Sequence, residues 1–345
     1  MTDCTGRLFE FPVCKRRNVE AEFSGGDVTS DGGIVLLRQV DRLLGLSAGV
    51  AQSLNDPRDP AKWTHATTDV VRQRLFGLAL GYEDLNDHQA LRHDPGFQTG
   101  VERDQVLAGS STLSRFENAA DREIFWSMHN VMVDRFIASH SIPPEELILD
   151  FDATDDPVHG KQDGRFFHGY YDSYCFLPLY VFCGDQPLVS YLRPANIDAM
   201  KHGGAMLKWL VKRLREAWPE VRIIFRADSG FCRHWLLGWC ERYDVGYIVG
   251  MARNPRLRRL SAEVIDRAAR EFERSGERQR LFGEIDYAAG PWKRERRVIV
   301  RAQHPEKGEN PRYVATHLDG EANDPYDRLY CARGGTATPI KEHLN

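Results

Sequence analysis

The 345-residue chain has no apolar run of about 18 residues, the shortest length that usually spans a membrane. It also has no excess of positive charge, because 46 lysine and arginine residues stand against 50 aspartate and glutamate residues. These absences argue against an integral membrane protein and against a protein that binds nucleic acid through its overall charge. Any contact with nucleic acid must therefore come from local basic patches.

Paired cysteine spacing is also missing. The seven cysteines are odd in number and form no Cys-x-x-Cys pair, which argues against a zinc site or a disulfide framework. No phosphate-binding or nucleophile-elbow motif is present, and the first residues show no apolar signal region. We therefore expect a cytoplasmic protein with reduced thiols.

Two short apolar segments that end in aspartate are the main chemical signal in the sequence. Residues 147–153 contain Asp152, and residues 221–227 are followed directly by Asp228. Ligands of open α/β sheets lie beyond the carboxyl ends of the strands, so neighbouring strands would bring the two aspartates to one point. Carboxylate oxygens suit a divalent cation such as Mg²⁺.

The same aspartates also have a structural explanation. Aspartate at a strand end often forms a turn or caps the next helix, and Asp228-Ser229-Gly230 suits a turn. For either residue alone this explanation is the simpler one. For the pair, with a helix expected between the two strands, a turn role and a cation site both remain open.

Apolar spacing divides the chain into five parts. We expect an N-terminal arm at 1–24, a helical domain at 25–142, a mixed α/β core at 143–252, a basic part at 253–318 and the end of the core at 319–345. The order within the core is three strands, helix, strand, helix, strand.

Several local patterns give testable boundaries. Thr29-Ser30-Asp31 offers an N-cap for the first helix. Cys175 to Cys183 and Pro187 to Leu192 are typical of a hairpin around Gly184-Asp185. Residues 261–274 have the spacing of a helix.

The basic part has two interpretations. Its acids alternate with arginines, which is typical of a solvated helix surface. A second cluster contains Trp292 with Arg294, Arg296 and Arg297, and basic side chains beside an aromatic ring also fit a surface that follows phosphates. We favour DNA contact through the three arginines.

An ordered series of short motifs carries a family resemblance. The motifs are residues 29–33 (TSDGG), 81–88 (GYEDLNDH), 91–95 (LRHDP), 111–118 (STLSRFEN), 150–154 (DFDAT), 168–172 (HGYYD), 192–196 (LRPAN) and 226–231 (RADSGF). With them the chain resembles bacterial insertion-sequence transposases with a DDE catalytic domain of the group 1 type, over nearly its whole length.

This resemblance implies an α/β fold with an RNase H-like mixed sheet flanked by helices. It adds an N-terminal all-helical, DNA-binding domain and a β-rich basic subdomain inserted at 253–318, which conflicts with the helix expected at 261–274. The first two catalytic acids of the family, which bind Mg²⁺ or Mn²⁺, fall on Asp152 and Asp228. His168, Tyr170 and Tyr171 would line the mouth of the site.

The third acid of the family belongs to a Tyr-x2-Arg-x3-Glu signature. Tyr330 and Arg333 match it, and we assign both to DNA contact, but Ala337 stands where the glutamate is expected. Glu342, five residues further on, would lie about 140° away around a helix and so cannot simply replace it. Because relatives continue past Asn345, we expect a truncated copy.

The implied function is metal-dependent strand cleavage and strand transfer at the ends of an insertion sequence. The partners would be double-stranded DNA, both the terminal inverted repeats and the target, with a homodimer assembled on DNA in the nucleoid. Two alternatives remain: a plain Mg²⁺-dependent nuclease of the same fold, and an inactive DNA-end-binding remnant that inhibits active copies.

Overall fold

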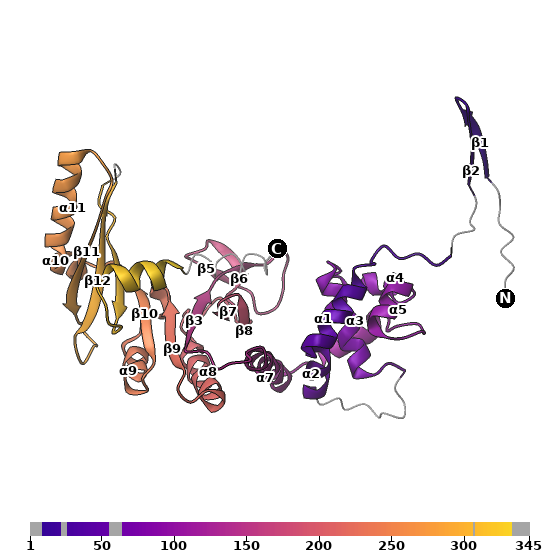
Figure 1. The fold of residues 1–345 in the computed structure, drawn as a ribbon, viewed down its shortest axis with the longest axis horizontal. Coiled ribbons are helices and arrows are strands. Elements are labelled where there is room, and N and C mark those ends of the chain that lie inside the picture. The colour runs from indigo at the N-terminus through magenta and orange to yellow at the C-terminus, as the bar shows by residue number, and fades with distance from the viewer. Residues whose placement is uncertain (1–8, 22–25, 55–63, 306–307, 333–345) are drawn as a thin grey trace. The chain divides into compact units, whose positions relative to one another are not determined.

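The computed structural model describes residues 9–21, 26–54, 64–305 and 308–332. The chain divides into two compact units, residues 1–131 and 132–345, and the division falls inside helix α7 (Arg122–Ala138). None of the helices in the described ranges is both long and apolar enough to cross a membrane. Figure 1 labels the elements of each unit and colours them by residue number.

The first unit begins with a hairpin where a loose arm was expected. Strands β1 (Phe9–Cys14) and β2 (Arg17–Ala21) pair in antiparallel fashion. Lys15, in the turn, has a positive φ of 59°. Apolar and polar residues alternate over Phe9–Val13, a period-2 signal that the basic run at 15–17 obscured.

The rest of the first unit is helical, as expected. Its helices are α1 (Ile34–Leu44), α2 (Leu46–Ser53), α3 (Thr67–Ala79), η2 (Leu85–Asp87), α4 (His88–Leu91), α5 (Pro95–Val101), α6 (Ser110–Asn118) and the first part of α7. One core cluster is built from Ile34, Phe76, Leu91, Phe97, Val101 and Leu107. Asp121 caps α7 by accepting a hydrogen bond from the Ile124 amide at 2.9 Å.

The expected cap of α1 is wrong. The helix begins after Gly33 without a side-chain cap. Instead, the Thr29 hydroxyl donates to Asp94 at 3.0 Å, and the Tyr82 hydroxyl donates to Asp31 at 2.9 Å. These side chains therefore join the motif at 29–33 to the distant motifs at 81–88 and 91–95.

The second unit contains an eight-stranded sheet in the order β11-β12-β13-β10-β9-β3-β7-β8. Its strands are β3 (Glu146–Ala153), β7 (Leu179–Cys183), β8 (Gln186–Tyr191), β9 (Arg222–Ala227), β10 (Gly246–Met251), β11 (Gln279–Tyr287), β12 (Arg296–His304) and β13 (Arg312–Thr316). β3, β9 and β10 are parallel, and the other pairs are antiparallel. The expected α/β class, a mixed sheet flanked by helices, is confirmed.

The two faces of the sheet are covered differently (Figure 1). Helices α8 (Gly203–Ala217) and α9 (His234–Arg242) bury one face together with Leu147, Leu149 and Phe151 of β3. The opposite face carries Ile148, Ile224 and Ile248 and packs against η4 (Pro325–Tyr330), a short π-helical segment. Alternate residues of β3 thus serve two separate cores.

The segment at 253–318 satisfies both conflicting expectations. Helices α10 (Pro255–Leu260) and α11 (Ala262–Ser275) come first, so the helix expected at 261–274 is confirmed. Strands β11, β12 and β13 follow, and β13 pairs with β10. The segment therefore extends the central sheet, while the five-part division of the chain stays a prediction.

A second, three-stranded sheet was not expected. It has the order β4-β6-β5, with β4 (Asp156–Pro157), β5 (Phe166–His168) and β6 (Ser173–Phe176). The single strand expected from Cys175 to Cys183 is wrong, because Leu177-Pro178 separates β6 from β7, and proline cannot donate to a strand ladder. The hairpin of β7 and β8 around Gly184-Asp185 is confirmed.

Candidate active site

Asp152, the second-last residue of β3, and Asp228, the residue directly after β9, occupy matching positions on two adjacent parallel strands. The β3–β9 register pairs Phe151 with Ala227, and the two aspartates are the next residues on their strands. Adjacent strands lie about 4.8 Å apart, so the two backbones are neighbours at this edge of the sheet. Both aspartates are partly buried.

A buried ion pair is formed by Asp150 and Arg226, which stand two residues before Asp152 and Asp228 in the sequence. The carboxylate of Asp150 accepts two hydrogen bonds from the guanidinium of Arg226, and their side chains are only 2% and 8% exposed. Arg226 also donates to the carbonyl oxygen of Leu329 in η4 at 2.5 Å. The pair therefore ties β3 to β9 and holds η4 against the same face.

Asp228 has the turn role that its sequence predicted. Its Oδ1 accepts a hydrogen bond from the Gly230 amide at 2.9 Å and so caps the short helix η3 (Ser229–Phe231). This bond fixes the direction of the carboxylate at the end of β9. The structural interpretation and the cation interpretation are therefore compatible for Asp228, because a carboxylate has two oxygens.

Tyr171 lies within the electrostatic reach of both aspartates. Burial, followed by the negative charges of Asp155, Asp152 and Asp228, raises the pKa of Tyr171 to about 12. Its hydroxyl donates to the carbonyl oxygen of Ala153 at 3.4 Å. The hydroxyl therefore stays protonated at neutral pH beside the strand ends.

The other two residues expected at the mouth of the site contact Tyr171. Ring centroids of His168 and Tyr170 lie 4.9 Å and 5.0 Å from that of Tyr171. Tyr170 is 85% exposed. The three rings therefore form one contacting group beside the strand ends.

Tyr330 reaches the same strand end from the other side. A Cβ placed on Gly250 would lie 2.5 Å from the Tyr330 hydroxyl and 3.3 Å from the Asp228 carbonyl carbon. Both residues line a pocket of about 410 Å³, together with Arg253 and Arg312. Glycine at position 250 thus permits the tyrosine and the Asp228 turn to approach closely.

The donor set at this edge fits part of a divalent-cation site. The two carboxylates offer the hard oxygen ligands that Mg²⁺ and Mn²⁺ accept. Within the described ranges, however, no group of three or more His, Cys, Asp or Glu side chains is arranged to hold a metal. Arg333, Ala337 and Glu342 lie outside the described residues.

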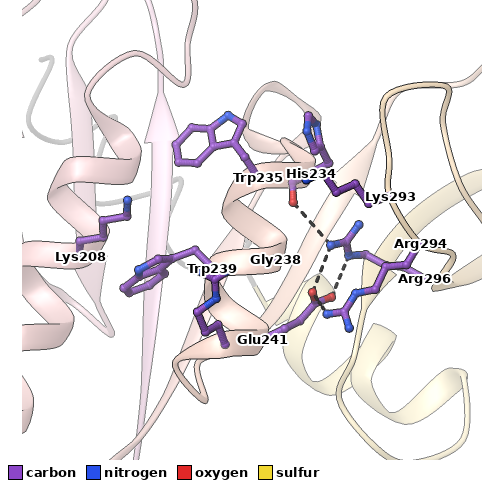
Figure 2. Close-up of a pocket in the computed structure, with 10 residues that line it drawn as sticks. Lys208, His234, Trp235, Gly238, Trp239, Glu241, Lys293, Arg294 and Arg296 are labelled. Atoms are coloured by element: carbon purple, nitrogen blue, oxygen red, sulfur yellow. Dashed lines mark hydrogen bonds and ion pairs between the residues drawn. The ribbon is translucent and has the colours of Figure 1, made fainter.

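The three arginines expected to contact DNA have acidic partners. Arg294 and Arg296 both donate to Glu241, as Figure 2 shows, and Arg296 is only 8% exposed. Arg297 donates to Glu284 and to two backbone carbonyls of residues 318 and 320. Contact with DNA stays a prediction for all three, but phosphates would compete with these existing bonds.

Two charged residues escaped sequence reasoning, Arg226 beside the carboxylate edge and Glu241 in the separate pocket of Figure 2. Arg226 and Glu241 each compensate a charge that the sequence alone left unexplained. A signal for Arg226 was available, because Asp150 and Arg226 stand two residues before Asp152 and Asp228 on equivalent apolar strands. Glu241 gave no such signal, since its two arginine partners lie more than 50 residues away in the sequence.

Comparison with known proteins identifies the family of the chain. The family model for the transposase DDE domain, group 1, matches residues 11–345. No curated protein sequence matches the chain. Among solved structures, a chain of the cryo-EM structure of the piggyBac transposase synaptic complex with hairpin DNA is similar, with 14% sequence identity and a TM-score of 0.39. The similarity covers 88% of this chain and 66%, slightly less than two thirds, of that chain. Because the family match spans nearly the whole sequence, the chain belongs to the group 1 DDE-domain transposases.

Proposed function

We propose that the chain is the transposase of an insertion sequence that cleaves and joins DNA strands at an edge formed by Asp152 and Asp228. The observation that carries the proposal is the matched position of these carboxylates on parallel strands β3 and β9. The family match supports transposition as the reaction class. Double-stranded DNA in the nucleoid of the cytoplasm, at terminal repeats and target, would be the substrate, with a homodimer as the working assembly.

Asp152 and Asp228 would hold Mg²⁺ or Mn²⁺. When bound, such an ion activates water or a 3′-hydroxyl and stabilises the leaving oxygen during in-line displacement at phosphorus. Asp150 and Arg226 keep the two strands in register below the ligands. Arg253 and Arg312, in the pocket beside Asp228, would place positive charge near the scissile phosphate.

We further propose that cleavage by this chain is impaired. Ala337 occupies the position of the third acid, and its methyl group supplies no oxygen ligand. Two carboxylates can retain one ion, whereas the two-metal reaction requires a more complete ligand set. This substitution favours the second candidate function, an inactive protein that binds DNA ends and competes with active copies.

Metal binding tests the carboxylate pair directly. Titration calorimetry with Mn²⁺ should show weaker binding for Asp152→Asn and for Asp228→Asn, each by tenfold or more, because either change removes a charged ligand. Asp156→Asn is the matched control: this neighbouring carboxyl, whose pKa is raised chiefly by burial, should leave the affinity unchanged. Equal affinity for wild type and Asp228→Asn would contradict the proposed site.

An assay of DNA nicking and strand joining distinguishes the three candidate functions. The purified chain is incubated with Mg²⁺ and a duplex carrying the element ends. We expect end binding with little nicking, in keeping with Ala337. Robust nicking that Asp228→Ala abolishes would contradict the proposed impairment. If cleavage appeared without joining of paired ends to a target, the result would identify a plain nuclease.

A further inference from the structure

A second pocket lies on the helical face of the sheet, apart from the carboxylate edge. It has a volume of about 780 Å³ and lies among α8, α9 and the segment that enters β12 (Figure 2). Five cationic side chains line it, against one carboxylate: Lys208, Arg242, Lys293, Arg294 and Arg296 against Glu241. This local excess of positive charge contrasts with the net charge of −4 of the whole chain.

Glu241 does not neutralise these cations one for one. Its carboxylate accepts hydrogen bonds from both Arg294 and Arg296, and from the Tyr247 hydroxyl at 2.9 Å. Among the residues that the structure describes, Arg242 and Lys293 form no ion pair, and the Nη1 atom of the buried Arg296 has no hydrogen-bond partner. The pocket therefore keeps the positive charges of Arg242 and Lys293 available for an anion.

Two tryptophans give the pocket aromatic walls. Trp235 and Trp239 project from α9, and the ammonium group of Lys208 lies 5.8 Å and 5.7 Å from their ring centroids. In Figure 2 the two indoles lie between Lys208 and the pair of arginines. Aromatic surface and cations are thus presented together, as in proteins that bind single-stranded nucleic acid.

The position of the Trp235 ring requires glycine at position 204. A Cβ on Gly204 would clash with the Trp235 ring, 2.8 Å from its Cζ3 atom. One side of the indole therefore lies against the backbone of α8, yet the side chain remains 47% exposed.

We propose that this pocket binds single-stranded DNA, with one base stacked on Trp235 and the adjoining phosphates held by Arg242, Lys293 and Arg294. The proposal rests on the transposase function and adds a strand-binding site away from the carboxylate edge. Bases inside a duplex are already stacked on both faces, so an indole can receive one only where the strand is unpaired. An acidic peptide would use the cations but would gain less from an open indole.

Fluorescence anisotropy with a labelled 15-nucleotide oligothymidine tests the stacking contact in the full chain. Loss of one base–aromatic contact should weaken binding by about 5- to 150-fold in Trp235→Ala. Trp235→Phe, which keeps an aromatic face, should bind within about threefold of wild type. Lys212→Gln is the matched control, because Lys212 lies one turn after Lys208 on α8 and outside the pocket.

The salt dependence of binding tests the phosphate contacts. Changing Arg242 and Lys293 together to glutamine should lower the slope of log affinity against log salt by about 1.4, since each single-strand phosphate contact contributes about 0.7. An unchanged slope, or equal binding by Trp235→Ala and wild type, would overturn the proposal. Equal displacement of the oligonucleotide by polyglutamate of matched charge would also overturn it, because the pocket would then recognise charge alone.

Binding of a duplex with the element ends distinguishes this site from the function on which it rests. If Trp235→Ala binds the duplex normally and also binds the single strand normally, only the pocket assignment fails. If wild type binds neither DNA, both the pocket and the proposed transposase function fail. Selective loss of single-strand binding in Trp235→Ala supports the pocket.

Discussion

Two guanidinium–carboxylate groups in the second unit use the same chemistry in different ways. Asp150 and Arg226 form a closed pair inside the sheet, with a carbonyl oxygen of η4 as the third partner. At the pocket on α9, two arginines share Glu241. The first group is electrically balanced and acts as a structural tie, whereas the second retains positive charge that a ligand can use.

Breaking the balanced pair should have the largest effect. Arg226→Met leaves the carboxylate of Asp150 buried without its partner and removes a donor from Leu329, so the free energy of unfolding should fall by about 3–5 kcal/mol. Urea denaturation followed by circular dichroism measures the change. The double variant Asp150→Leu/Arg226→Met should recover most of the loss; a double variant as unstable as the single one would argue against an unpaired charge as the cause.

Removing the shared carboxylate should cost less. Glu241→Gln deprives Arg296 and Arg294 of their anion, but Arg294 is well exposed and water can solvate it. We expect a fall of about 1–3 kcal/mol in the free energy of unfolding, chiefly from the buried Arg296. Glu284→Gln, which removes the partner of Arg297 at a more exposed position, serves as the control and should cost less than about 1 kcal/mol.

The smallest effect concerns pH at the carboxylate edge. The folded pKa of Tyr171, about 12, lies above its usual value of 10, so its contribution to stability is present below pH 10 and is lost as pH rises from 10 through 12. Tyr171→Phe should therefore lose less stability over this window than wild type. Parallel stability curves for the two proteins would show that burial and the nearby carboxylates do not raise the pKa of this hydroxyl.

The sequence predicted what depends on local periodicity and on charge at strand ends. The helix expected between the two aspartate-containing segments is present as α8, and the apolar spacing at 261–274 located α11. It failed where distant partners decide the outcome. Thr29 and Asp31 bond to Asp94 and Tyr82 instead of capping α1, and no local pattern reveals such partners.

The candidate site follows the same division. Asp152 and Asp228 were identified because each stands at the end of an apolar segment of the sequence. The register of β3 and β9 then places the two residues at matching positions on neighbouring strands. The acidic partners of Arg294, Arg296 and Arg297 were not foreseen. The sequence of an arginine-rich stretch does not show whether carboxylates from other elements form ion pairs with its side chains. Tertiary contacts decide which cations remain available.

The pairing of β10 with β13 also has a consequence for biosynthesis. β10 ends at Met251, but the strand that covers its outer edge begins only at Arg312. Translation proceeds at about 5–20 residues per second, so that edge of β10 stays unpaired for several seconds while α10, α11, β11 and β12 are synthesised. An unpaired edge of this kind is a template for association between nascent chains, so folding on the ribosome should be sensitive to the speed of elongation across residues 252–311.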